Sequence, residues 1–161
     1  MSISEEDMLN ALFSPISQVD SIVYIGNRAG SQDLELLKSH NIKRILQIQS
    51  IDASPLFPND FIYHCIVLGD SPYNDLSQVI PDALGFIADA ISTNQRVFVH
   101  CDAGASRSGS IIVAYLIGKH AILFEEALEI ARSRRACISP NPGFERQLRQ
   151  LNPNALHQIF I

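Results

Sequence analysis

The chain has 161 residues, of which 47% are hydrophobic and 18% charged, and its formal net charge at pH 7 is −5. This composition is typical of a globular domain, and the acidic balance argues against nucleic acid or an anionic membrane as a partner. Three cysteines without a Cys-x-x-Cys pair support neither a disulfide framework nor a cysteine zinc site. We therefore expect one domain over residues 1–161, with a core from about 18 to 151, in the cytoplasm or nucleus and with neither a secretory leader nor a membrane span.

Apolar and β-branched runs alternate with helical patterns along the chain. The sequence predicts strands at residues 21–26, 43–49, 61–68 and 96–100. It predicts helices at residues 31–40, with Ser31 as the N-cap, and at 78–92, 109–119, 124–131 and 144–151. This alternation predicts an α/β fold with a mostly parallel central sheet of about five strands and helices on both faces.

Residues 97–109, VFVHCDAGASRSG, pass from a buried strand through small residues into an apolar helix. Ligands of open α/β sheets lie beyond the carboxyl ends of the strands, and the N–H groups at a helix N-terminus favour an anion. Arg107 can add a planar fork for two oxygens. The same N–H groups would stabilise Cys101 as a thiolate, which is the nucleophilic form. The loop therefore predicts an oxyanion cradle with a nucleophile at its base, although a free cysteine is often only a small buried side chain.

The segment VHCDAGASRSGS resembles the His-Cys-x5-Arg-Ser/Thr signature of the cysteine-dependent protein phosphatases, and more narrowly that of the dual-specificity phosphatases. Further stretches resemble the same subfamily: residues 23–46, AYLI at 114–117 and ISPNPGFERQL at 138–148. The resemblance covers about residues 18–151. It implies hydrolysis of phosphotyrosine and phosphoserine or phosphothreonine through a phosphocysteine intermediate, without a metal or other cofactor. Phosphorylated proteins, signalling kinases among them, would be the substrates.

The resemblance also assigns roles within the loop. Cys101 would attack the phosphoryl group, and Ser108 would donate to the departing sulfur, although a serine there could equally be a first-turn cap. His100 would orient the loop and Asn141 would brace it from behind, where the alternatives are a core histidine and a turn asparagine. The equatorial oxygens would be held by Arg107 and by the amides of Asp102, Ala103, Gly104, Ala105 and Ser106.

The leaving oxygen needs a proton, and the family carries an aspartate about thirty residues before the cysteine. Asp70 lies 31 residues before Cys101, just past a predicted strand, and we expect it to be the general acid. Asp75 is the second candidate. Asp82 follows Pro81 inside a helical pattern and is interpreted as a helix-start residue.

Other residues carry weaker signals. One of Arg134 and Arg135 could line the mouth of the site for a second phosphate, but the favoured interpretation is a solvated helix C-terminus. Cys65 and Cys137 could resolve an oxidised Cys101, but inert packing is favoured. No group of His, Asp or Glu has metal-ligand spacing.

The sequence leaves two alternative functions. Relatives that act on phosphoinositides carry lysines inside the loop, whereas this loop has none and has Asp102 beside the nucleophile. A non-catalytic phosphate-binding module is the other alternative, and such relatives usually lack the nucleophile. Cys101, Arg107 and a candidate acid are all present here.

Overall fold

The computed structural model describes residues 2–161. In chain order the elements are α1 (Glu5–Phe13), β1 (Ile16–Gln18), β2 (Val23–Gly26), α2 (Arg28–Ser31), α3 (Leu34–Ser39), β3 (Ile42–Gln49), β4 (Ile62–Val67), α4 (Ile80–Ser92), β5 (Arg96–His100), α5 (Arg107–His120), α6 (Phe124–Arg134), α7 (Pro142–Arg149), α8 (Pro153–His157) and the 3-10 helix η1 (Gln158–Phe160).

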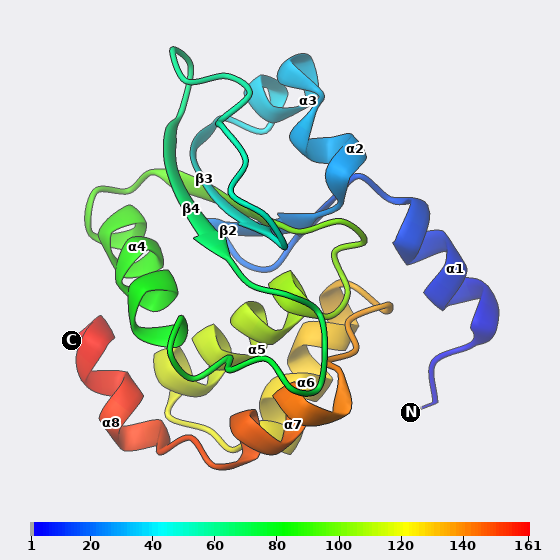
Figure 1. Ribbon diagram of the computed structural model, residues 1–161, viewed down its shortest axis with the longest axis vertical. Coiled ribbons are helices and arrows are strands. Elements are labelled where there is room, and N and C mark those ends of the chain that lie inside the picture. The colour runs from blue at the N-terminus through cyan, green and yellow to red at the C-terminus, as the bar shows by residue number, and fades with distance from the viewer. Residues whose placement is uncertain (1) are drawn as a thin grey trace.

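The sheet has the strand order β1-β2-β5-β3-β4. Strands β2, β5, β3 and β4 are parallel to one another. Only β1 runs antiparallel, and it pairs with β2. Helices α2 and α3 cover one face, and α4 to α8 lie on the other side (Figure 1). The predicted α/β class, the five-stranded and mostly parallel sheet and the helices on both faces are thus confirmed.

An apolar layer fills each side of the sheet. The larger one lies between the sheet and α4, α5 and α6, and the smaller one contains Leu37 of α3 together with Phe61 and Phe98. Helix α5 is buried on every side from Arg107 to Gly118, and residues 111–117 of it are an uninterrupted apolar run. The N-terminus of α5 follows β5, a central strand, so the loop between them is held by the core on both sides.

The predicted helix 31–40 is two short helices, and Ser31 is not its N-cap. The Ser31 hydroxyl donates to the carbonyl of Arg28 at 2.7 Å, and Ser31 ends α2. Asp33 is the N-cap of α3, because its carboxylate accepts from the amide of Leu36 at 3.0 Å. The carboxylate of Asp33, two residues after Ser31, therefore caps the helix in place of the Ser31 hydroxyl.

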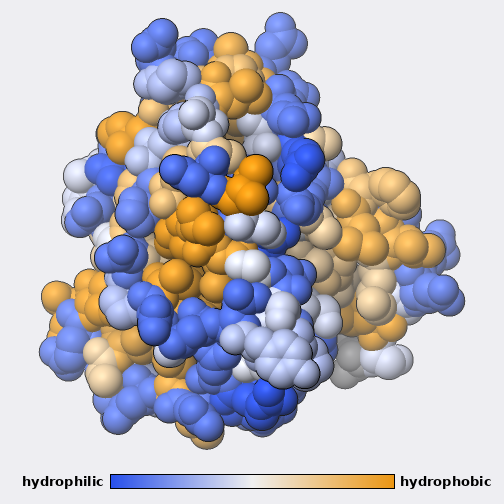
Figure 2. All heavy atoms as spheres, viewed as in Figure 1, coloured by the Kyte–Doolittle hydropathy of each residue, from blue (hydrophilic) through white to orange (hydrophobic). Residues whose placement is uncertain are grey.

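The sequence predicts no element before residue 21, but the structure has α1 and β1 there. The signal for α1 is Ser4, whose hydroxyl accepts from the amide of Asp7 at 3.0 Å. Helix α1 buries none of its residues, and Figure 2 shows apolar side chains gathered at the right edge, where α1 lies in Figure 1. Among residues 2–161 no helix is long and apolar enough to cross a membrane.

Candidate active site

The loop from Cys101 to Arg107, called the phosphate loop below, connects the carboxyl end of β5 to α5. Its backbone carbonyls accept hydrogen bonds from the surrounding structure. The donors are Nδ1 of His100 to Cys101 (3.5 Å), the amide of Arg28 to Asp102 (2.9 Å), Nη2 of Arg135 to Ala103 (3.0 Å), Nε of Arg135 (2.8 Å) and Sγ of Cys137 (3.7 Å) to Gly104, and the amide of Ser139 to Ala105 (3.0 Å). The carbonyl side of the phosphate loop is therefore satisfied from Cys101 to Ala105.

The amides of the phosphate loop after Cys101, unlike its carbonyls, have no hydrogen-bond partners among the described residues. Within residues 2–161, no amide from Asp102 to Arg107 donates a hydrogen bond. A planar trans peptide directs its N–H opposite to its C=O, so tying the carbonyls to the rear directs the following N–H groups to the front. Gly104 has φ +68°, a left-handed conformation of the kind found in loops whose successive amides face a bound anion.

Cys101 lies at the start of this ring of amides and is 2% exposed. Its Sγ is 3.0 Å from Oγ of Ser108 and 3.5 Å from the Ser108 backbone nitrogen, which donates to it. Ser108 is fully buried in the first turn of α5. The sulfur thus has the Ser108 amide as a donor and the Ser108 hydroxyl within hydrogen-bond distance on the helix side, and the phosphate loop in front.

Arg107 is held by the ends of two neighbouring strands. Its Nη1 donates to Oγ of Ser50, just after β3, at 2.8 Å and to the carbonyl of Leu68, just after β4, at 3.4 Å. Its Nη2 donates to Oδ2 of Asp102 at 3.0 Å. The buried Nε has no hydrogen-bond partner among residues 2–161. An unsatisfied buried donor costs about 1–3 kcal/mol, so this nitrogen favours an incoming oxygen atom.

Asp102 forms a bridge between two arginines. Its second carboxylate oxygen accepts from Nη2 of Arg28 at 2.7 Å. Burial raises the pKa of Asp102, but hydrogen bonds from Arg28 and Arg107 outweigh burial and lower this pKa from its ordinary value. The carboxylate is therefore ionised and neutralised by its neighbours, which offsets its negative charge beside Cys101.

His100 is 1% exposed at the end of β5. Burial lowers the pKa of His100 to about 4, against the smaller opposite effect of its contact with the Cys101 carbonyl. The ring stacks on Phe98 with centroids 5.6 Å apart. His100 is consequently neutral at neutral pH and supports the backbone of the phosphate loop.

Asp70 and Asn141 are brought together from positions 71 residues apart. Nδ2 of Asn141 donates to Oδ1 of Asp70 at 3.0 Å, and the Asn141 amide donates to Oγ of Ser106 at 3.0 Å. Asn141 also caps α7 through the amide of Phe144. The side chain of Asp75 accepts from the amide and hydroxyl of Ser77, as an ordinary turn residue does. Of the two candidate acids, Asp70 is the one that contacts Asn141.

The favoured interpretation of Arg135 as a solvated residue is wrong. Arg134 is exposed at the end of α6, but Arg135 is 1% exposed and donates to the rear of the phosphate loop. The chain leaves the helix at Arg135, with φ −144° and ψ 101°, and this turns the side chain inward. No signal in the sequence separates these adjacent arginines.

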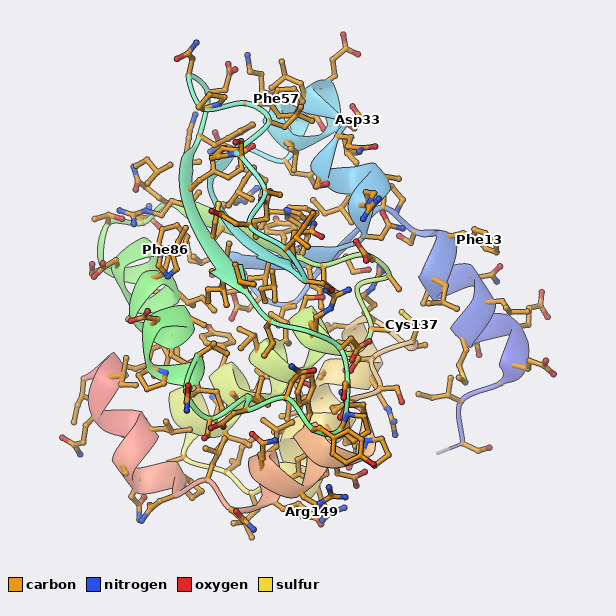
Figure 3. The ribbon with its side chains drawn as sticks, viewed as in Figure 1. Phe13, Asp33, Phe57, Phe86, Cys137 and Arg149 are labelled. Carbon is orange, nitrogen blue, oxygen red and sulfur yellow. The ribbon has the colours of Figure 1, made fainter. Side chains whose placement is uncertain are left out.

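The remaining candidates lie outside the ring of amides. Cys65 and Cys137, like Cys101, are free thiols, and Cys137 lies on the side of the molecule that faces α1 (Figure 3). Among residues 2–161, no group of three or more His, Cys, Asp or Glu could hold a metal ion. A cavity of about 980 Å³ between α1 and α6 contains no residue of the phosphate loop.

Comparison with known proteins agrees with this site. Residues 23–154 match the family described as "Dual specificity phosphatase, catalytic domain". Dual specificity protein phosphatase 1B of Arabidopsis thaliana is 39% identical over 84% of this chain and 80% of its own length. Dual specificity protein phosphatase 22-B of Danio rerio is 35% identical over 89% and 78%. The crystal structure of DUSP15 superposes with a TM-score of 0.84 at 27% identity, covering 91% of this chain and 92% of that one.

The matched region contains β2 to α7 and every residue of the phosphate loop. The phosphorylated substrates of this family are proteins, so the phosphoinositide alternative is not favoured. The chain belongs to the dual specificity phosphatase family and is a protein phosphatase acting on phosphotyrosine and on phosphoserine or phosphothreonine.

Proposed function

We propose that Cys101 is the nucleophile of this phosphatase and that the phosphate loop, with Arg107, holds the transferred phosphoryl group. The observation that carries the proposal is the polarity of the loop, whose carbonyls are bonded on the rear side while the amides of residues 102–107 have no partner within residues 2–161. Such a ring matches the equatorial oxygens of a phosphoryl group and leaves the sulfur in line with the leaving oxygen.

In the first step the Cys101 sulfur attacks phosphorus. The S–P bond forms, the P–O bond to the substrate breaks, and Asp70 gives its proton to the leaving oxygen. In the second step Asp70 takes a proton from water, and that water attacks phosphorus. The S–P bond breaks, Ser108 donates to the departing thiolate, and inorganic phosphate is released. The 3.0 Å contact between Ser108 Oγ and the sulfur supports this role.

Arg107 and Asn141 position the reacting groups. The free Nε–H of Arg107 would donate to a phosphoryl oxygen while its other nitrogens stay bonded to Ser50, Leu68 and Asp102. Asn141 would hold Asp70 next to the leaving oxygen and tie it to the phosphate loop through Ser106. His100 supports the carbonyl of Cys101 as a neutral ring.

Phosphorylated signalling kinases are the proposed substrates within the wider class of phosphoproteins. The phosphate loop carries no lysine that would attract a polyanionic inositol headgroup. The three free cysteines support a reducing compartment, the cytoplasm or nucleus, as the place of action.

The test compares wild type with Cys101→Ser on p-nitrophenyl phosphate, on phosphotyrosine, phosphothreonine and phosphoserine peptides, and on phosphoinositide vesicles. We expect turnover of the aryl phosphate and peptides, weak turnover of the vesicles, and none by the variant. The Cys101→Ser protein should still bind phosphopeptides, because the ring of amides is unchanged. Turnover by Cys101→Ser at the wild-type rate would overturn the assignment of the nucleophile.

A further inference from the structure

The buried guanidinium of Arg135 is the feature of the molecule that the mechanism above leaves unused. Arg135 follows α6 directly and is 1% exposed, among the most buried large side chains of the protein. No carboxylate of residues 2–161 forms an ion pair with it. A buried charge without an ionic partner is costly and persists only where several dipoles surround it.

Those dipoles come from two separate segments. On one side Nε donates to the carbonyl of Gly104 at 2.8 Å and Nη2 donates to the carbonyl of Ala103 at 3.0 Å. On the other side Nη1 donates to the carbonyl of Ser14 at 2.9 Å and to Oγ of Ser17 at 3.0 Å. Arg135 thereby joins the rear of the phosphate loop to the segment that leads into β1.

The two loop carbonyls determine where two amides point. The carbonyl of Ala103 belongs to the same planar peptide as the amide of Gly104, and the carbonyl of Gly104 to the same peptide as the amide of Ala105. Drawing both carbonyls to the rear turns both N–H groups to the front. The contact is tight, because a Cβ on Gly104 would lie 2.8 Å from Nη2 of Arg135 and 2.6 Å from the carbonyl oxygen of Gly26.

We propose that Arg135 is a positioning residue for catalysis, which aims the amides of Gly104 and Ala105 at the phosphoryl oxygens by holding the carbonyls of Ala103 and Gly104. The inference builds on the proposed phosphate-binding role of the loop and adds the residue that shapes it. The fork geometry of the guanidinium is essential, since one planar group must serve four oxygens in fixed directions.

The chain offers a matched control for this residue. Arg134 is the same residue type one position earlier, is exposed and has no hydrogen bond to the phosphate loop. Arg135→Met removes both the charge and the fork, whereas Arg135→Lys keeps the charge but offers a compact ammonium that cannot reach all four oxygens. Arg134→Met removes an equivalent charge at the surface.

The experiment measures tungstate affinity by calorimetry and the kcat and KM for p-nitrophenyl phosphate in the four proteins. For Arg135→Met and Arg135→Lys we expect tungstate affinity to fall at least about tenfold and kcat/KM to fall on the order of 10²-fold, as for the loss of oxyanion donors. Arg134→Met should stay within about twofold of wild type, as surface substitutions do. In ¹H–¹⁵N spectra the amide signals of Gly104 and Ala105 should shift with tungstate in wild type and not in the Arg135 variants.

Several outcomes would overturn the proposal. If folded Arg135→Met keeps wild-type tungstate affinity and kcat/KM, Arg135 has only a structural role. If Arg135→Lys keeps tungstate affinity and kcat/KM within about twofold of wild type, the charge and not the fork geometry is what matters. If neither Arg135 variant folds, the residue serves stability and the positioning role is rejected. Tungstate binding needs no turnover, so these outcomes can be distinguished from a failure of the proposed chemistry. In that second case the wild-type protein would bind tungstate but would not hydrolyse phosphate esters.

Discussion

At the residue scale, His100 connects the stability of the protein to its active site. The ring is buried against Phe98 and its Nδ1 faces the carbonyl of Cys101. Its pKa is about 4 in the folded protein, compared with 6.5 for an ordinary histidine. Between pH 6.5 and 4 the unfolded chain binds more protons at His100 than the folded protein does. The free energy of unfolding is therefore unaffected by His100 protonation above pH 6.5 and decreases as the pH falls toward 4.

This difference predicts a pH-dependent free energy of unfolding. Between pH 6.5 and 4, His100 should contribute a slope of at most about 1.4 kcal/mol per pH unit, with stability falling as the pH falls. Urea unfolding of wild type and His100→Asn over this range measures the contribution. The variant should lose stability less steeply than wild type on acidification. Equal slopes in the two proteins would contradict a buried, neutral His100.

The side chain of Asp70 carries the second residue-scale prediction. Asp70→Asn should lower kcat by roughly 10²-fold on a phosphoserine peptide, because an alkoxide leaving group needs a proton. The loss should be smaller on p-nitrophenyl phosphate, whose leaving group departs as a stable anion. Steady-state kinetics on both substrates measures this contrast. Asp75→Asn is the matched control, since Asp75 is engaged with Ser77, and a larger loss there would transfer the role of the acid to Asp75.

At the scale of elements, α7 holds the loop that carries Asp70. Asn141 caps the helix and donates to Asp70. Gln147, six residues further along, donates to the carbonyl of Asn74 at 3.0 Å and accepts from the amide of Ser77 at 3.1 Å. The loop after β4 is therefore attached to α7 at both of its ends. Gly143 allows this approach, because a Cβ there would lie 2.0 Å from the carbonyl oxygen of Pro72.

Gly143→Ala should displace the loop and with it Asp70. We expect kcat/KM to fall by up to roughly 10²-fold through misplacement of the acid, and the free energy of unfolding to fall by about 1–3 kcal/mol through overpacking. Tungstate affinity should be retained, because the phosphate loop itself is unaltered. Gly85→Ala in α4 is the control, since a Cβ at Gly85 meets nothing within 4 Å. That variant should be as stable as wild type or up to about 1 kcal/mol more stable. A Gly143→Ala protein with wild-type kcat/KM would contradict the coupling.

At the scale of the whole molecule, the sequence predicts the fold and the chemical centre but not the supports around them. Periodicity identified α4 and the buried strands because their apolar faces are long and regular, and the spacing from Cys101 to Arg107 identified the loop. The bonds from Arg135 to Ser14 and from Arg28 to Asp102 span 121 and 74 residues, and no local pattern encodes such contacts. Strand β1 was missed because it has only three residues at a sheet edge. Chain topology, rather than local sequence, places these supports behind the phosphate loop.

The central claim, transfer of a phosphoryl group to Cys101, is tested most directly by isolating the covalent intermediate. Ser108→Ala removes the hydroxyl that lies 3.0 Å from the sulfur and should slow the second step more than the first. Rapid quenching of this variant with an aryl phosphate, followed by mass spectrometry of its peptides, should find one phosphoryl group on Cys101 and a burst of about one aryl alcohol per enzyme. Turnover without any phosphoryl group on Cys101, or with the group on another residue, would contradict the account.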